Sequence, residues 1–190
     1  MDSALALGAG RFRFRAPSGN PVLRILALFG AAVALMGAGY LCGLRYNGSP
    51  SFPKGFYLLS ALSGDPGVGI LVFACPPDTE AFREARVRHY IGPGTCPGGF
   101  TPIIKKLAGR AGDAVLVGAT VSINGVEQPN SAVAALDGKG RPLETYAGGT
   151  VPEGHVLLLS DFYAGSFDSR YFGPLELRQI IGRAQPLLTW

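Results

Sequence analysis

Ser51 lies in a short stretch, Ser49-Pro50-Ser51-Phe52-Pro53-Lys54-Gly55, whose composition would hold a hydroxyl group in a fixed position. Pro50 and Pro53 restrict the backbone φ angle on either side of Ser51, and Gly55 permits backbone angles that other residues avoid. The loop is therefore expected to be pre-shaped. A serine held in this way could act as a nucleophile, provided that the chain supplies a base for its proton.

Histidine and lysine are the two candidates for that base. His89 and His155 are the only histidines, and Ser51 does not lie in a nucleophile elbow of the type Gly-x-Ser-x-Gly. A Ser-His-Asp triad thus has no supporting motif. A lysine can serve instead, because burial penalises the charged ammonium and lowers a pKa that starts at about 10.4.

Lys105 and Lys106 lie in a predicted strand over residues 100–108, directly after two isoleucines. Because side chains alternate along a strand, one lysine is expected to face inward and the other to face water. An inward lysine on an apolar strand is costly unless it is neutral, which is the state that a general base needs. The alternative is an edge strand from which both lysines reach solvent. Alternation alone does not decide which lysine faces inward.

Three motifs resemble, in order, the characteristic segments of the type I signal peptidases, the serine-lysine membrane peptidases. The first runs from Ser51 to Tyr57, the second from Ile104 to Asp113 and the third from Ser166 to Gly173. The resemblance covers residues 49–183. It is strongest for the conjugative-transfer branch of the family, because of the compact Ser-x-Pro-x-Gly-x-Tyr form and the Cys-Pro-Pro and Cys-Pro-Gly-Gly segments.

The resemblance implies a catalytic pair. Ser51 resembles the nucleophile of the family. Lys105 rather than Lys106 resembles the general base, since the family's lysine lies eight residues before the aspartate that here is Asp113. The family pattern thus makes a choice that strand alternation leaves open.

Four further residues resemble supporting groups. The Ser51 N–H would stabilise the oxyanion, with Ser49 as a candidate second donor because it lies two residues earlier. Ser166 matches a serine that positions the lysine amine, and Asp168 and Arg170 match an acid and a base that shape the site. The alternative from the residues alone is simpler: Ser166 is a turn residue and Asp168 with Arg170 is a salt bridge that organises a loop.

An apolar segment near the N-terminus is long enough to cross a membrane. Residues 25–44 carry no charge, and a helix of that length spans a hydrocarbon core of roughly 30 Å. A cleaved signal peptide would have a shorter apolar region, so we expect an uncleaved anchor. We predict a cytoplasmic tail over residues 1–21, a transmembrane anchor over 22–45 and a periplasmic serine peptidase domain over 46–190. The orientation follows from arginines that precede the segment: Arg11, Arg13, Arg15 and Arg24.

The charge balance argues against nucleic acid as a partner. The chain has a formal net charge of +4, but from Arg45 onward it holds 13 Lys and Arg against 12 Asp and Glu. A nucleic-acid-binding domain would carry a basic face on its folded part. The membrane and a precursor protein are the expected partners.

The three cysteines are Cys42, Cys75 and Cys96. Cys75 and Cys96 flank a short polar insertion and could form a disulfide in an oxidising compartment, although two reduced, partly buried thiols would have the same spacing. No Cys-x-x-Cys pair occurs, and the two histidines are not at ligand spacing, so we predict no metal and no other cofactor.

Short apolar strands, frequent Gly and Pro turns and one helical stretch predict a mainly β domain. The helix is expected over residues 80–90, and Asn124-Gly125 predicts a hairpin. The resemblance implies a signal-peptidase-like β domain with one short helix, preceded by a single N-terminal transmembrane helix.

The resemblance also implies a function. It predicts a membrane-anchored serine endopeptidase that processes exported precursors at the periplasmic membrane face, most specifically a pilin precursor for conjugative transfer, whose product could be cyclised. The alternatives are a housekeeping signal peptidase that removes leader peptides, and a non-catalytic docking subunit of a conjugation or secretion apparatus.

Overall fold

The computed structural model describes residues 20–62, 64 and 66–190, and its chain divides into two units, Met1–Gly39 and Tyr40–Trp190. The predicted tail over residues 1–21 falls almost wholly outside the described residues. Helix α1 (Pro21–Leu41) has a mean hydropathy of 2.0 and is long and apolar enough to cross a membrane. Its first turn is capped, because the Asn20 side chain accepts a hydrogen bond from the Val22 N–H at 3.0 Å.

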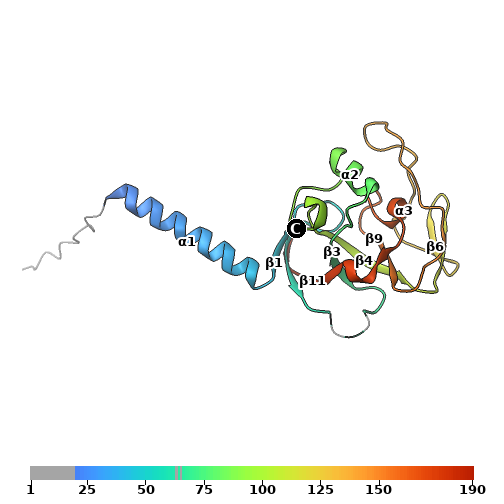
Figure 1. The fold of residues 1–190 in the computed structure, drawn as a ribbon, viewed down its shortest axis with the longest axis horizontal. Helices are drawn as coiled ribbons and strands as arrows, with labels where there is room; N and C mark the ends of the chain where they lie inside the picture. Colours follow the sequence, from blue (N-terminus) through green and yellow to red (C-terminus); the bar gives the residue numbers. More distant parts are fainter. Residues whose placement is uncertain (1–19, 63, 65) are drawn as a thin grey trace, which may run out of the picture. The chain divides into compact units, whose positions relative to one another are not determined.

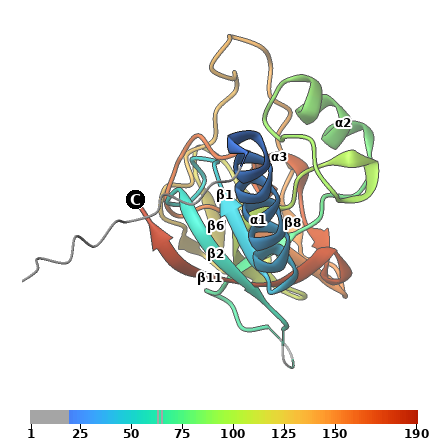
Figure 2. The same ribbon diagram turned by 90° about the vertical axis from the view of Figure 1, so that its left-hand side faces the viewer.

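The larger unit is built on a seven-stranded antiparallel sheet with the order β1-β2-β11-β3-β4-β9-β10. Figure 1 shows the neighbouring strands β3, β4 and β9, and Figure 2 shows β2 beside the long β11. The strands are β1 (Leu44–Asn47), β2 (Gly55–Ser60), β3 (Leu71–Ala74), β4 (Ile103–Arg110), β9 (His155–Leu159), β10 (Leu175–Glu176) and β11 (Ile180–Thr189).

Strand β4 carries both lysines and is not an edge strand. It pairs with β3 on one side and with β9 on the other, so the edge-strand alternative is wrong. The Lys105 side chain is buried, with 3% of its surface exposed. Lys106, on the opposite face of the strand, forms an ion pair with Asp161 at 2.7 Å and remains partly exposed. The alternation predicted for the two side chains is therefore confirmed.

A second sheet has the order β7-β6-β5-β8. The predicted hairpin at Asn124-Gly125 joins β6 to β7, and both turn residues have positive φ angles, 51° and 81°. These angles explain why asparagine and glycine occupy the turn. The strands of this sheet are β5 (Ala114–Val117), β6 (Val121–Ile123), β7 (Val126–Glu127) and β8 (Gly149–Thr150).

Two short α-helices and two 3₁₀ turns complete the domain: α2 (Glu80–Val87), α3 (Ser169–Phe172), Pro97–Gly99 and Leu177–Gln179. Helix α2 is the predicted helix, but it ends near Arg88 because His89 takes a positive φ of 65°. Helix α3, which the sequence patterns do not predict, is a single turn. The prediction of a mainly β domain is confirmed.

Cys75 and Cys96 are joined by a disulfide, which closes the segment that contains α2. The bond links the end of β3 to the residues that lead into β4. Cys42 is free and exposed, directly after α1. The disulfide therefore braces the two neighbouring strands next to the buried lysine.

Candidate active site

The loop between β1 and β2, residues 48–54, presents Ser51 above an aromatic cluster. The Ser51 side chain is buried, and so is Phe52 beside it. Phe52 packs with Tyr57 of β2, Phe73 of β3 and Ile104 of β4. This packing ties the base of the serine loop to the central strands of the sheet, including the strand that carries Lys105.

Ser51, Lys105 and Ser166 form a compact polar triangle, although 54 and 61 residues separate Lys105 from its two serine partners. The Lys105 Nζ lies 2.7 Å from the Ser51 Oγ and 2.6 Å from the Ser166 Oγ. The two serine oxygens lie 3.1 Å apart. Three residues that the sequence motifs single out are thus brought together by the fold.

The environment of Lys105 favours its neutral form. Burial lowers the pKa of the Lys105 ammonium from 10.5 to about 8, because the apolar sheet replaces the water that would solvate the charge. The carboxylate of Asp168 opposes this shift, and the guanidinium of Arg170 adds to it. A neutral amine at hydrogen-bond distance from a serine hydroxyl has the geometry of a general base and its nucleophile.

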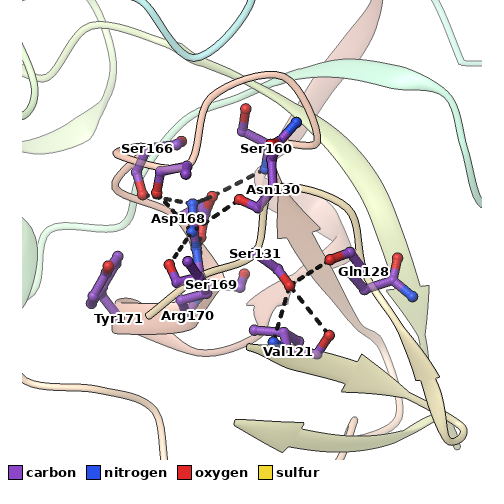
Figure 3. A network of polar contacts seen from close by, with 12 residues as sticks. Val121, Gln128, Asn130, Ser131, Ser160, Ser166, Asp168, Ser169, Arg170 and Tyr171 are labelled. Atoms are coloured by element: carbon purple, nitrogen blue, oxygen red, sulfur yellow. Dashed lines mark hydrogen bonds and ion pairs between the residues drawn. The ribbon is translucent and has the colours of Figure 1, made fainter. Parts of the chain in front are cut away.

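Asp168 and Arg170, which Figure 3 shows beside Ser166, form a fully buried ion pair. Two guanidinium nitrogens of Arg170 each lie 2.8 Å from a different carboxylate oxygen of Asp168. Arg170 also donates to the carbonyl oxygen of Ser166 at 3.0 Å and to that of Ala164 at 2.8 Å. The pair therefore organises the residue 160–173 loop and holds the backbone that carries Ser166.

Ser49 lies in the serine loop, but its hydroxyl is engaged. The Ser49 Oγ donates a hydrogen bond to the Oδ1 of Asn47 at 2.7 Å. A role as oxyanion donor would require the hydroxyl to rotate away from Asn47. The backbone N–H of Ser51 has no hydrogen-bond acceptor in the described part of the chain and is available for a ligand.

A small cleft of about 130 Å³ opens onto Ser51 and Lys105. The cleft is lined by the serine loop, by the start of β4, by the disulfide-closed segment and by the residue 160–173 loop. Among its lining residues are Tyr46, Ser49, Tyr90, Ile91, Ile103 and Phe167. A larger hollow beside α2, of about 470 Å³, contains neither Ser51 nor Lys105.

This geometry agrees with what the chain resembles. The model of the signal peptidase family, peptidase S26, matches residues 21–190. The chain belongs to the peptidase S26 family. The three residues of the polar triangle all lie within the matched region, as do Asp168 and Arg170.

Several curated relatives of this S26 protein come from conjugal transfer systems. It is 46% identical to a probable conjugal transfer protein TraF of Sinorhizobium fredii, covering 90% of this chain and 92% of the relative. It is 43% identical to a conjugal transfer protein TraF of Agrobacterium tumefaciens, covering 87% and 96%. It is 40% identical to a plasmid transfer protein TraF of Escherichia coli, covering 85% and 92%. A solved signal peptidase I of Enterococcus faecalis aligns with a TM-score of 0.39 and 22% identity, covering 63% of this chain and 97% of that structure.

The histidines of this S26 protein stay outside the site. His89 is exposed at the end of α2, and the Nδ1 of His155 lies 2.9 Å from the Glu153 carbonyl oxygen. Neither ring contacts Ser51 among the contacts of the described residues. Those residues also contain no group of His, Cys, Asp and Glu side chains suited to a metal ion.

Two buried residues that sequence reasoning missed also touch the serine loop. Asn47 ends β1, and Ser160 directly follows β9; their side chains bond to backbone groups of residues 49–53. Neither residue belongs to one of the three motifs. A polar residue at the end of an apolar strand is the only sequence signal for Ser160, and it is a common one.

Proposed function

We propose that this S26 protein is a membrane-anchored serine endopeptidase in which Lys105 is the general base for Ser51. The observation that carries the proposal is the contact between the buried Lys105 Nζ and the Ser51 Oγ, 2.7 Å apart. Burial alone would leave Lys105 a costly structural residue. Burial beside a serine hydroxyl, at the edge of a cleft, instead favours a catalytic role for the lysine.

The mechanism begins with neutral Lys105. Its amine accepts the Ser51 proton while the Ser51 oxygen attacks the scissile carbonyl carbon, and the Ser51 N–H donates to the developing oxyanion. The ammonium of Lys105 then gives its proton to the leaving amine, which departs and leaves an ester on Ser51. Lys105, neutral again, takes a proton from the water that attacks the ester carbonyl and gives it to the Ser51 oxygen as the ester bond breaks, which releases the acid product and restores the serine hydroxyl and the neutral amine. Ser166 holds the amine in line throughout these steps.

We place the reaction at a membrane surface. Helix α1 has the length and hydropathy of a membrane anchor, and the arginines before it favour a cytoplasmic N-terminus. The domain also exposes three neighbouring aromatic rings, those of Tyr46, Phe56 and Trp190, with centroids 5.5 to 6.5 Å apart. Aromatic side chains of this kind are enriched at membrane interfaces. A periplasmic domain also fits the Cys75–Cys96 disulfide, which needs an oxidising compartment.

The substrate we propose is an exported precursor protein of a conjugation apparatus, most specifically a pilin precursor. The names of the curated relatives support the link to conjugal transfer. The small volume of the cleft supports small side chains before the cleaved bond. If the precursor's own amino terminus replaces water as the acceptor of the acyl group, the product is a cyclic peptide; its mass is then lower by that of one water molecule.

The test compares four full-length proteins in detergent micelles: the wild type, Ser51→Ala, Lys105→Met and Lys106→Met. The substrate is a fluorogenic peptide with alanines before the scissile bond. We expect Ser51→Ala and Lys105→Met to lose cleavage, and Lys106→Met, whose side chain pairs with Asp161 instead, to remain within a few-fold of the wild type. Retained cleavage by Ser51→Ala would overturn the serine mechanism, whereas no cleavage by any of the four proteins, the wild type included, would favour a docking subunit. Loss of cleavage by Lys106→Met alone would show that the wrong lysine is assigned.

The substrate class is tested in a donor cell that carries the neighbouring transfer genes. Deletion of this chain should leave an unprocessed pilin precursor, and only a plasmid copy with Ser51 intact should restore processing. Intact-mass measurement of the mature pilin then separates a linear product from a cyclic one. Normal pilin maturation in the deletion strain would contradict the proposed substrate.

A further inference from the structure

The loop that carries Ser51 makes few backbone hydrogen bonds of its own. Among the described residues, no backbone N–H donates to the carbonyl oxygens of residues 51, 52 and 53. A loop without such bonds is ordinarily mobile, because nothing fixes its peptide planes. Side chains take over this role here, and two of them come from strand ends on either side of the site.

The first side chain is the amide of Asn47. Its Nδ2 lies 3.2 Å from the carbonyl oxygen of Ser49 and 3.1 Å from those of Phe52 and Pro53. Its Oδ1 accepts from the Ser49 N–H at 3.1 Å and from the Ser49 hydroxyl at 2.7 Å. Only 6% of Asn47 is exposed. The loop therefore wraps around one buried amide group.

The second side chain is the hydroxyl of Ser160, which is 1% exposed. The Ser160 Oγ donates to the carbonyl oxygen of Ser51 itself at 2.5 Å. The Ser160 Oγ also accepts hydrogen bonds from the N–H groups of Phe162 and Tyr163, at 3.3 and 3.1 Å. Three partners therefore set the direction of the Ser160 hydroxyl: the carbonyl oxygen of Ser51 and the N–H groups of Phe162 and Tyr163.

Ser160 also connects the nucleophile to the buried ion pair. Its backbone N–H donates to the Oδ2 of Asp168 at 3.0 Å, an interaction drawn in Figure 3. Asp168 is locked by Arg170, which in turn holds the carbonyl oxygen of Ser166. The Asp168–Arg170 ion pair is therefore connected by hydrogen bonds to both serines. Asp168 bonds to Ser160, which bonds to Ser51, and Arg170 bonds to Ser166, which contacts Lys105.

From these contacts we infer that Asn47 and Ser160 are positioning residues, which fix the distance between the Ser51 Oγ and the Lys105 Nζ by holding the backbone of the serine loop. The inference rests on the proposed function, since it concerns the geometry of that reaction. Neither side chain contacts Lys105. Their effect on catalysis is transmitted through the Ser51 backbone. Ser160 gives the clearer test, because it does not line the cleft and its replacement leaves the cleft wall unchanged.

The expected loss in cleavage rate follows from how strongly the attack of the Ser51 oxygen depends on the positions of the reacting groups. A displacement of about 1 Å between reacting groups costs about 10²-fold in rate. Ser160→Ala removes the donor to the Ser51 carbonyl and leaves Lys105 with the same neighbours. Asn47→Asp keeps the shape and the Oδ1 acceptor but turns the donor that faces three carbonyl oxygens into a repelling acceptor.

The experiment measures steady-state cleavage of the fluorogenic alanine peptide by the full-length wild type, Ser160→Ala, Asn47→Asp and Ser131→Ala. Ser131 is the matched control, because it is also a buried serine (3% exposed) that donates to a backbone carbonyl, that of Gln128, while its hydroxyl contacts only Val121 and Gln128 and not the serine loop (Figure 3). For Ser160→Ala we expect a kcat about 10²-fold lower, an unchanged KM and an unchanged pH midpoint. For Asn47→Asp we expect a similar loss in kcat, and for Ser131→Ala a kcat within about twofold of the wild type.

Amide hydrogen exchange provides a second readout that does not depend on activity. Exchange of the N–H groups of residues 49 and 52 should be faster in Ser160→Ala and Asn47→Asp than in the wild type and Ser131→Ala, with unchanged exchange in β4. Unchanged exchange in the serine loop would overturn the inference even if the chain proved inactive. Wild-type kcat in Ser160→Ala, with Ser51→Ala inactive, would overturn the inference and leave the proposed function intact.

Discussion

The Nζ of Lys105 lies 2.6 Å from the Ser166 Oγ, slightly closer than it lies to the Ser51 Oγ. The amine is therefore held between two hydroxyls, one from the β1–β2 loop and one from the residue 160–173 loop. Because an amine nitrogen approaches a serine productively from a narrow range of directions, the second contact restricts the amine to the direction needed by the first.

Removal of the second contact should slow the chemistry. We expect Ser166→Ala to lower kcat by about 10²-fold with little change in KM, because the Lys105 amine loses the partner that orients it. Ser169→Ala is the matched control, since Ser169 is equally buried but bonds to the Leu158 N–H. The control should lose about 1 kcal/mol of unfolding free energy and keep its kcat. Equal kcat losses in the two variants would point to a general packing effect.

Cleavage should depend on pH through Lys105. Only the neutral amine accepts the Ser51 proton, so kcat/KM should rise about tenfold per pH unit below the lysine pKa of about 8 and level off above it. The profile of the fluorogenic peptide assay from pH about 6 to about 10 measures this. A rise in kcat/KM with its midpoint near pH 6.5, the ordinary pKa of histidine, would instead indicate a histidine base.

Burial of Lys105 should cost stability at neutral pH. The folded pKa lies below the ordinary value of 10.5, so the unfolded chain binds more protons between about 8 and 10.5 and stability rises with pH in that window. Below pH 8 the full penalty applies. Lys105→Met should therefore raise the free energy of unfolding by about 3 kcal/mol at pH 7, as measured by urea denaturation. Lys106→Met, with its partly exposed side chain, should show no such gain; a less stable Lys105→Met protein would contradict the argument.

Removal of one partner of the Asp168–Arg170 pair should lower the free energy of unfolding more than replacement of both partners by apolar residues. Asp168→Asn leaves the Arg170 charge buried without its partner, and we expect a loss of about 3–5 kcal/mol in the free energy of unfolding. The double variant Asp168→Leu with Arg170→Met should recover part of that loss in the same urea titration. Glu176→Gln, in an exposed ion pair with Arg178, should leave the urea midpoint unchanged. Additive losses in the double variant would show that the two side chains do not act as a pair.

The Cys75–Cys96 bond should stabilise the domain and the cleft wall. It closes a segment with a sequence separation of 21 that supplies Tyr90 and Ile91 to the cleft. Replacement of both cysteines by serine should cost about 3 kcal/mol in the free energy of unfolding and raise KM more than it lowers kcat. Alkylation of denatured protein should modify one thiol, Cys42, without reductant and three after reduction. Three modified thiols without reductant would contradict the bond.

Local patterns predict much of the fold. The uncharged run predicts α1, the Asn124-Gly125 pair predicts the β6–β7 hairpin, and the apolar stretches predict most strands of both sheets. These features depend on neighbouring residues, whose hydrophobicity and backbone preferences act over a few positions. The sequence patterns do not predict strand β1, because Leu44 belongs to the apolar run and residues 45–47 take their structure from pairing with β2.

For the site, the chain itself determined which residues carry chemistry: Ser51 in a proline-stiffened loop, and a lysine pair of which alternation turns one member inward. Only the tertiary structure decided that β4 is a central strand, which buries Lys105 and lowers its pKa. It also decided the partners of Ser51, because Lys105, Ser160 and Ser166 lie 54, 109 and 115 residues away. Contacts over such separations depend on how whole strands pack, and they cannot be predicted from the residues next to Ser51 in the sequence.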